Sequence, residues 1–305
     1  MKIVFMGTPE FACPILEALN EKYEVVLVVS QPNKPEGRKG IIKETPVASL
    51  ASKLGLNLYQ PISIIESVSY FDDIDADIMV TAAYGQFVPT KILKKFKKCL
   101  NVHGSLLPKH RGGAPIQRSI INGDKQTGVT IMEMVKKMDA GQMYAKRSID
   151  ILDTDNNESL FEKLSIIGRD LLIESIEGII NGEIKGIPQD ESEATISPNI
   201  EVWEEKIDFN LPAKDVFNKI RGLSVNPGAY ALINDFRIKV YSSQIVTDNS
   251  DKVPGSIILM KKRLIVKCKD DAVELLMIQP QGKKQMLARD FLNGQKNFSD
   301  NDIFN

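Results

Sequence analysis

The chain has 305 residues, of which 43% are hydrophobic and 26% charged, with a net charge of -1. This length is long for one domain and comfortable for two, and the composition is that of a globular protein that needs no metal or disulfide to fold. The three cysteines include no C-x-x-C pair, which argues against a disulfide framework or a zinc ribbon and favours a reducing cytoplasm. No apolar run reaches transmembrane length, and the stretch after Lys2 is too short for a signal peptide. We therefore expect a cytoplasmic protein that does not bind a membrane.

The two ends of the chain differ in charge. Residues 206–305 contain 16 Lys and Arg against 11 Asp and Glu, whereas the rest contains 23 against 29. An acidic, polar stretch with Pro188 and Pro198 separates them, and we predict domains at 1–190 and 206–305 joined by a linker at 191–205. The positive end would favour a polyanion, although such an excess is more often a solvated surface.

The first part alternates apolar runs with helical patterns. The continuous apolar runs are typical of strands buried on both faces, and Thr45 is a suitable N-cap for the helix that follows it. The segments that we expect are strands at 3–6, 25–29 and 78–83, and helices starting near Pro14, at about 46–55 and at about 158–180. This alternation predicts a doubly wound, Rossmann-like α/β domain with parallel strands.

The pattern changes to short β-rich segments after residue 205. We expect a helix at about 212–221, then strands at 229–233, 237–241, 256–258, 263–268 and 272–278. Several short strands at nearly regular spacing predict a small β-barrel.

A polar pair ends an apolar run in the stretch CLNVHGSLLP at residues 99–108. Asn101 and His103 are two residues apart, so in a strand their side chains share one face. The chain has only two histidines, His103 and His110, and so few side chains that titrate near neutrality. Position alone does not distinguish a structural from a catalytic role for His103. For Asn101 it favours a structural role at the end of a strand over a catalytic one.

The sequence resembles the folate-dependent formyltransferases in NVHGSLLP, RGGAPIQRSI and GVTIMEMVKKMDAG, in that order and spacing. The resemblance extends from MGTPEF at 6–11 through QPNKPEGR at 31–38 and AAYGQFVP at 82–89 into the second domain, and it covers essentially the whole chain. It implies transfer of the formyl group of 10-formyltetrahydrofolate to the α-amino group of methionyl initiator tRNA. It also implies a Rossmann-like formyltransferase domain followed by an OB-like β-barrel that positions the tRNA.

The resemblance places the catalytic roles on Asn101, His103 and Asp139. Attack of an amine on a formyl amide builds negative charge on the carbonyl oxygen, and the attacking nitrogen must lose a proton. The Asn101 amide and a protonated His103 would stabilise the oxyanion, and donors of this kind contribute roughly 10²- to 10³-fold each. Asp139 would favour the imidazolium, orient it and help to move a proton to the departing folate nitrogen. No metal is required.

The resemblance also implies a pterin cleft. Backbone groups near Gly85 to Val88 would bind the pterin edge, and glycine at 85 permits close approach, although the same segment is also a plain strand-to-helix turn. An apolar slot with a few fixed polar groups suits such a ligand. The residues that we expect to bind the folate are Gly85, Gln86, Phe87, Val88, Ser105, Leu106, Leu107 and Pro108.

Residues 31–47 form a long connection between a strand and a helix, and such loops are usually functional or disordered. The family has an insertion here that grips the acceptor arm of the tRNA. Ile41 and Ile42 stand where the family pattern is more basic. The residues that we expect to contact tRNA are Arg38, Lys39 and Lys43 in this loop, and Lys206, Arg221, Lys261, Lys262 and Arg263 in the second domain, with binding weakened by salt.

Two alternatives stay open. One is a formyltransferase that acts on a small amine, such as glycinamide ribonucleotide or an amino sugar; the extra domain and the 31–47 loop argue against it. The other is a tRNA-binding module without catalysis, which an intact Asn101, His103 and Asp139 argues against. We expect a monomer.

Overall fold

The computed structural model describes residues 1–36, 40–260, 262–294, 299 and 302–305. Contacts divide the chain into two compact units. The first contains Met1–Pro115, Thr127–Ile149 and Phe161–Pro198, and the second contains Ile116–Gln126, Asp150–Leu160 and Asn199–Asn305. The domain boundaries at residues 190 and 206 stay predictions. None of the helices in the described ranges is long and apolar enough to cross a membrane.

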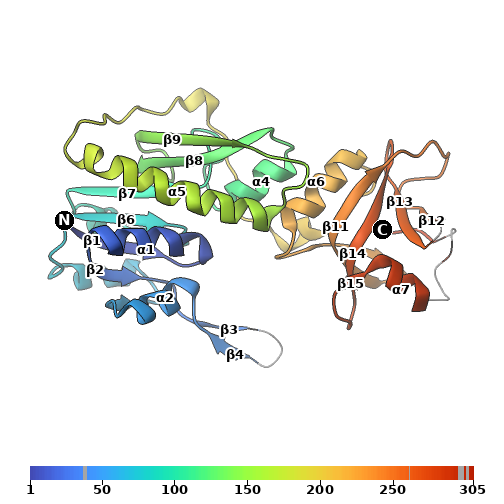
Figure 1. The fold of residues 1–305 in the computed structure, drawn as a ribbon, viewed down its shortest axis with the longest axis horizontal. Helices are drawn as coiled ribbons and strands as arrows, with labels where there is room; N and C mark the ends of the chain where they lie inside the picture. The colour runs from blue at the N-terminus through green and yellow to red at the C-terminus, as the bar shows by residue number, and fades with distance from the viewer. Residues whose placement is uncertain (37–39, 261, 295–298, 300–301) are drawn as a thin grey trace. The chain divides into compact units, whose positions relative to one another are not determined.

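The first unit is built on a seven-stranded sheet with the order β5-β2-β1-β6-β7-β8-β9 (Figure 1). Strands β5, β2, β1, β6 and β7 pair in parallel, whereas β7 pairs with β8 antiparallel. The strands are β1 (Lys2–Gly7), β2 (Glu24–Val29), β5 (Leu58–Tyr59), β6 (Ile78–Ala82), β7 (Lys98–His103), β8 (Gln126–Glu133) and β9 (Met143–Asp150). The predicted α/β domain and its first strands are therefore confirmed.

Helices pack on this sheet. In Figure 1, α1 and α5 lie in front of it, and Ser165 Oγ of α5 donates at 2.8 Å to the carbonyl of Phe11, just before α1 begins. Thr45 caps α2 as predicted, because its Oγ1 accepts from the Ala48 N–H at 3.2 Å. The helices and small strands of this part are η1 (Glu10–Ala12), α1 (Cys13–Lys22), β3 (Lys34–Glu36), β4 (Ile41–Lys43), α2 (Pro46–Leu54), η2 (Ile65–Phe71), α3 (Thr90–Leu93) and η3 (Glu191–Glu193). Helix α4 (Pro115–Ile121) belongs to the second unit from Ile116 on, and α5 (Asn157–Ile180) begins in the second unit and belongs to the first from Phe161 on.

The strand order reverses beside β1. The chain moves from β1 outward to β2 and β5, then returns to the other side of β1 as β6. In open α/β sheets, ligands bind outside the carboxyl ends of the strands at such a reversal. The carboxyl ends of β1, β6 and β7 are therefore where the fold favours a site.

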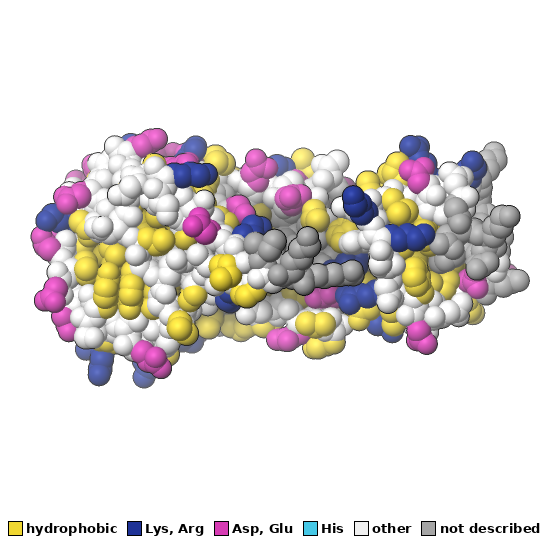
Figure 2. Space-filling model, turned by 90° about the horizontal axis from the view of Figure 1, so that it is seen from below, with side chains coloured by type: hydrophobic (Ala, Val, Ile, Leu, Met, Phe, Trp, Pro, Cys, Tyr) yellow, Lys and Arg dark blue, Asp and Glu magenta, His cyan; other side chains and the backbone are white. Residues whose placement is uncertain are grey.

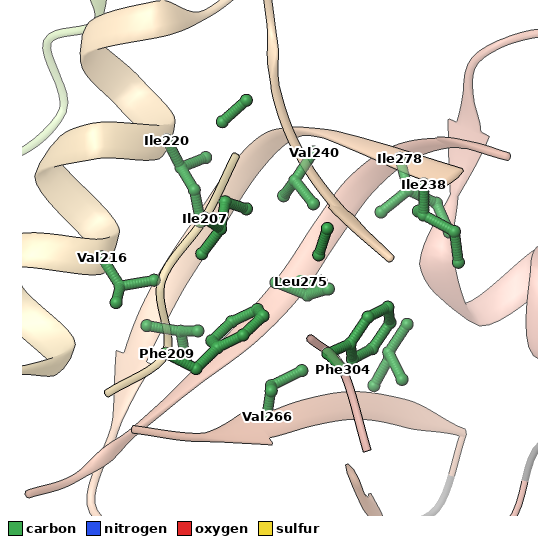
Figure 3. Packing of buried hydrophobic residues seen from close by; sticks show 14 of the residues in the cluster. Ile207, Phe209, Val216, Ile220, Ile238, Val240, Val266, Leu275, Ile278 and Phe304 are labelled. Atoms are coloured by element: carbon green, nitrogen blue, oxygen red, sulfur yellow. The ribbon is translucent and has the colours of Figure 1, made fainter. Parts of the chain in front are cut away.

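The second unit contains an antiparallel sheet of order β10-β11-β14-β13-β12, with β15 paired to β14. The elements are η4 (Val202–Glu205), α6 (Ala213–Leu223), β10 (Ala229–Ile233), β11 (Phe236–Val246), β12 (Ile257–Met260), β13 (Arg263–Lys267), β14 (Ala272–Pro280), β15 (Met286–Leu287) and α7 (Ala288–Gly294). Phe209 and Phe304 pack among aliphatic side chains in its core (Figure 3). This half-barrel confirms the predicted β-rich second domain.

Strand β11 is longer than predicted. We expected a strand at 237–241, but pairing with β14 continues to Val246. The register shifts between Val240 and Ser243, and the polar residues there interrupt the apolar alternation by which a strand is recognised.

Candidate active site

Asn101 and His103 lie at the carboxyl end of β7, beside the strand reversal. Asn101 is half-buried, and His103 is only 5% exposed. Two residues apart on one strand, they share a face as predicted. In the register of β6 and β7, Asn101 lies opposite Thr81.

Thr81 fixes which way the Asn101 amide points. The Thr81 hydroxyl donates to Asn101 Oδ1 at 2.8 Å, the shortest of its contacts, and Thr81 is 3% exposed. Because the amide oxygen accepts this bond, the two amide hydrogens of Asn101 lie on the other side of the group. The side chain is thus held as a donor. Sequence reasoning missed Thr81, since its role depends on β6 and β7 being neighbours.

His103 is oriented through its Nε2 atom, which lies 2.9 Å from the carbonyl oxygen of His110. A carbonyl has no proton to give, so Nε2 must carry the hydrogen and donate it. The other ring nitrogen, Nδ1, is therefore the one that can exchange a proton with a substrate.

The structure brings Asp139 to this nitrogen. Asp139 lies in the turn between β8 and β9, and its Oδ2 is 3.8 Å from His103 Nδ1. This separation is an ion-pair distance and longer than a hydrogen bond, so a substrate atom or a water can share a proton with both groups. The same Oδ2 accepts from the Gly112 N–H at 2.8 Å. Asp139 has a φ of +49°, an uncommon left-handed conformation for a residue other than glycine.

The segment predicted to bind the pterin edge follows β6. Gly85 has a φ of +83°, which strains any residue with a Cβ, and a Cβ there would lie 2.3 Å from Gln31 Nε2. Gln86 Oε1 accepts from the Ile64 N–H at 3.0 Å and its Nε2 donates to the Ile62 carbonyl at 3.4 Å, so this side chain ties the segment to residues 62–64. Phe87 is 48% exposed and Val88 is buried, which offers an apolar wall.

The turn after β7 is held from within. Ser105 Oγ donates to the Lys109 carbonyl at 2.7 Å, and Thr130 Oγ1 donates to the Ser105 carbonyl at 2.7 Å. Leu107 is buried and Leu106 is partly exposed, with Pro108 next to them. Ser105 and Leu107 therefore shape the turn, and Leu106 is the more accessible of the two leucines.

The residues predicted to contact tRNA differ from one another in their surroundings. Arg38, Lys39 and Lys261 lie outside the described residues. Lys43, Lys206 and Lys262 are exposed. On the face drawn in Figure 2, Lys and Arg side chains of the described residues are interspersed with Asp and Glu.

The two arginines of this set are engaged in contacts. Arg263 donates to Glu274 Oε2 at 2.6 Å, and this contact raises the pKa of Arg263. Arg221 is 7% exposed and donates to the Leu152 and Asp155 carbonyls at 2.7 and 2.9 Å. Burial lowers the pKa of Arg221. Against our expectation, the Arg221 guanidinium is buried in contacts that hold residues 150–160, and it is not placed to meet a phosphate.

Among the residues that the structure describes, no three His, Cys, Asp or Glu side chains gather in a way that could hold a metal ion. The observed geometry brings together an oriented amide, an oriented imidazole and a carboxylate. An amide donor, a ring nitrogen and a carboxylate at one strand edge suit acyl transfer to a nucleophile that must lose a proton.

Comparison with known proteins agrees with this chemistry. The sequence-family model described as formyl transferase matches residues 1–176. The sequence-family model described as formyl transferase, C-terminal domain, matches residues 199–296. The chain belongs to the formyl transferase family.

Two relatives cover nearly the whole chain. The methionyl-tRNA formyltransferase of Lactobacillus acidophilus is 49% identical over 298 residues, 96% of this chain and 95% of the relative. That of Streptococcus thermophilus is 48% identical over 99% of both chains.

Solved structures share the fold at lower identity. WlaRD, a sugar 3N-formyl transferase solved with dTDP and 5-N-formyl-THF, has a TM-score of 0.69 at 20% identity and covers 93% of this chain and 99% of its own. HypX from Aquifex aeolicus, in complex with tetrahydrofolic acid, has a TM-score of 0.65 at 16% identity and covers 100% of this chain and 50% of its own. These likenesses show the fold alone.

Proposed function

We propose that the protein transfers the formyl group of 10-formyltetrahydrofolate to the α-amino group of methionyl initiator tRNA. The observation that carries this choice is the 48–49% identity, over almost the full length, to enzymes named methionyl-tRNA formyltransferase. We further expect a monomeric, cytoplasmic enzyme, with domains at 1–190 and 206–305 joined by the 191–205 segment.

Asn101 and His103 would stabilise the charge that develops in the reaction. As the amine nitrogen bonds to the formyl carbon, the carbonyl oxygen becomes an oxyanion. The Asn101 amide, held as a donor by Thr81 at 2.8 Å, presents its N–H groups to such an oxygen. A donor that is fixed before the reaction costs no reorganisation at the transition state, which makes it effective in a site shielded from water.

His103 and Asp139 would carry the proton. The attacking amine must lose one proton, and the folate nitrogen must gain one as its bond to the formyl carbon breaks. The 3.8 Å between His103 Nδ1 and Asp139 Oδ2 leaves room for a proton carried by substrate or water to be shared between them. One proton thus passes from amine to folate with no net change in the enzyme.

The donor and acceptor would meet the protein at different places. We assign the folate to the backbone of Gly85 to Val88 and to the turn from Ser105 to Pro108, with the exposed Phe87 as an apolar wall. The proposed tRNA contacts are the exposed Lys43, Lys206 and Lys262 together with Arg38, Lys39, Lys261 and Arg263.

One comparison tests this function. Initial rates of formyl transfer from 10-formyltetrahydrofolate should be measured with methionyl initiator tRNA, glycinamide ribonucleotide and an amino sugar under matched conditions. We expect measurable transfer to the tRNA alone. The structural likeness to a sugar formyltransferase makes the amino sugar the sharpest competitor, and transfer to it without transfer to tRNA would overturn the proposal.

A further inference from the structure

The turn that carries Asp139 depends on contacts from elsewhere in the chain. Left-handed backbone at a residue other than glycine persists where the surroundings enforce it. Asp139 has this conformation, with a φ of +49°. Its carboxylate accepts from the Gly112 N–H, which leaves the backbone of the turn to be held by another group.

Gln189 holds that backbone. Its Nε2 atom donates to the Asp139 carbonyl at 2.7 Å and to the Gly141 carbonyl at 2.8 Å. Both amide hydrogens of Gln189 therefore bind carbonyls that are two residues apart in the same turn. Gly141 cannot be replaced without movement, because a Cβ there would lie 1.9 Å from the Glu133 carbonyl oxygen.

Arg111 in turn fixes Gln189. Its Nε donates to Gln189 Oε1 at 3.0 Å, so the amide oxygen of Gln189 has a donor of its own and the group cannot flip. Arg111 is 2% exposed, and its two terminal nitrogens bind both oxygens of Glu191 at 2.9 and 3.1 Å. Lys137 adds a second cation at 2.5 Å from Glu191. A buried guanidinium with this many partners is a rigid anchor.

The same segment also reaches the partner of His103. Ser197 Oγ lies 2.7 Å from His110 Nδ1, and Thr195 Oγ1 accepts from the His110 N–H at 2.9 Å. The His110 carbonyl in turn accepts from His103 Nε2. The chain approaches closely here because residue 112 is glycine, where a Cβ would lie 2.6 Å from the Ser197 carbonyl oxygen. Residues 189–197 thus contact the supports of both His103 and Asp139.

We propose that Gln189, anchored by Arg111, is a positioning residue that sets the separation of Asp139 and His103 for formyl transfer. This inference rests on the proposed function. The contacts of Gln189 are with the backbone of the Asp139 turn and with Arg111, so Gln189 acts through that turn. A small displacement of a catalytic group can cost as much as 10²-fold in rate, and loss of two hydrogen bonds permits one.

Two variants of Gln189 separate positioning from folding. Gln189→Met keeps the length of the side chain and removes all three hydrogen bonds. Gln189→Glu keeps the acceptor for Arg111 but, at pH 8, places a carboxylate against the carbonyls of Asp139 and Gly141. We expect both to lower kcat for methionyl initiator tRNA by about 10-fold or more, with KM within about 2-fold. The unfolding temperature of each variant should be measured, and the rates compared well below it, so that a loss of kcat reports the site and not the folded fraction.

A double-mutant cycle with Asp139→Ala gives the decisive readout. If Gln189 acts through Asp139, then Gln189→Met should lower the single-turnover rate of the wild type but leave that of Asp139→Ala unchanged within about 2-fold. Arg147→Met is the matched control, because Arg147 also pairs with a glutamate, Glu174, but away from this turn. It should keep the wild-type kcat.

The outcomes are distinct. The inference is overturned if both Gln189 variants keep the wild-type kcat. It is also overturned if Gln189→Met lowers the rate of Asp139→Ala by the same factor as that of the wild type, or if Arg147→Met loses as much activity as Gln189→Met. An inactive wild type with methionyl initiator tRNA would instead overturn the proposed function.

Discussion

Asn101 and His103 lie on a regular strand, whereas Asp139 lies in a strained turn, and the two regions obtain their geometry by different means. On β7, the pleat places the two side chains on one face, and a neighbour in the sheet, Thr81, orients the amide. In the turn, Asp139 is held by Gly112 and Gln189 from elsewhere in the sequence. The strand is supported by its ladder of hydrogen bonds, and the turn by individual side chains.

This difference has a consequence for mutation. Substitutions on the strands should remove a chemical group or release a neighbouring side chain and leave the backbone in place, because the ladder of hydrogen bonds holds it independently. Substitutions around the turn should move Asp139 as well as remove a contact. The predictions below compare the two regions, beginning with the largest expected effect.

On the strand, His103→Ala should lower kcat by at least about 10²-fold, since general acid and base groups contribute about 10² to 10⁴. It also removes the Nε2 hydrogen bond to the His110 carbonyl, which should cost about 1 kcal/mol or more of unfolding free energy. Single-turnover formyl transfer and urea unfolding measure the two effects. A near-normal single-turnover rate would remove His103 from the mechanism.

Thr81→Val should lower kcat by about 10-fold with little change in KM. Valine has nearly the shape of threonine but cannot donate to Asn101 Oδ1, so the amide is free to turn away. A net hydrogen bond is worth about 0.5–1.5 kcal/mol, and the upper end of this range corresponds to a rate factor of about 10. Thr81→Ser keeps the hydroxyl and is the control. Equal rates in both variants would show that the ladder alone orients Asn101.

The site residues on the strand can be predicted from the sequence better than those in the turn. Two-residue spacing places Asn101 and His103 on one face, and scarcity of histidine singles out His103. Thr81 could not be found in this way, because its partner is 20 residues away on a strand whose neighbour is known only from the fold. Asp139 is indicated by the family resemblance alone. Its supports lie further still, with Gln189 separated from it by 50 residues and Arg111 from Gln189 by 78. Local patterns do not report such contacts.

In the turn, Asp139→Gly should be more stable than Asp139→Ala by about 1 kcal/mol. Both variants lose the carboxylate that binds the Gly112 N–H, so this loss cancels between them. Alanine must keep a φ near +49°, which is strained, whereas glycine adopts it readily; glycine's larger unfolded-state entropy offsets part of the gain. Urea unfolding of the two proteins gives the difference. A more stable alanine variant would mean that the turn relaxes once the carboxylate is gone.

The smallest expected effect concerns Glu191 and its dependence on pH. Hydrogen bonds from Arg111 and then Lys137 lower the pKa of Glu191 from 4.5 to about 2. Because the pKa is lower in the folded state, this carboxylate contributes stability that is fully present above its unfolded pKa and is lost as the pH falls through the folded value. The contribution is modest, because Glu191 is 57% exposed and water screens the ion pair.

The variant Glu191→Gln isolates the contribution of the Glu191 charge to stability, because glutamine retains one acceptor for Arg111 and does not titrate. We expect the difference in stability between the wild type and this variant to stay constant from pH 8 to about 5, and to shrink between about pH 4.5 and 2. Urea unfolding of both proteins across this range is the measurement. The variant also provides the baseline for every other group that titrates over the same range. A difference that stays constant down to pH 2, or one that grows, would mean that Arg111 is anchored without the charge of Glu191.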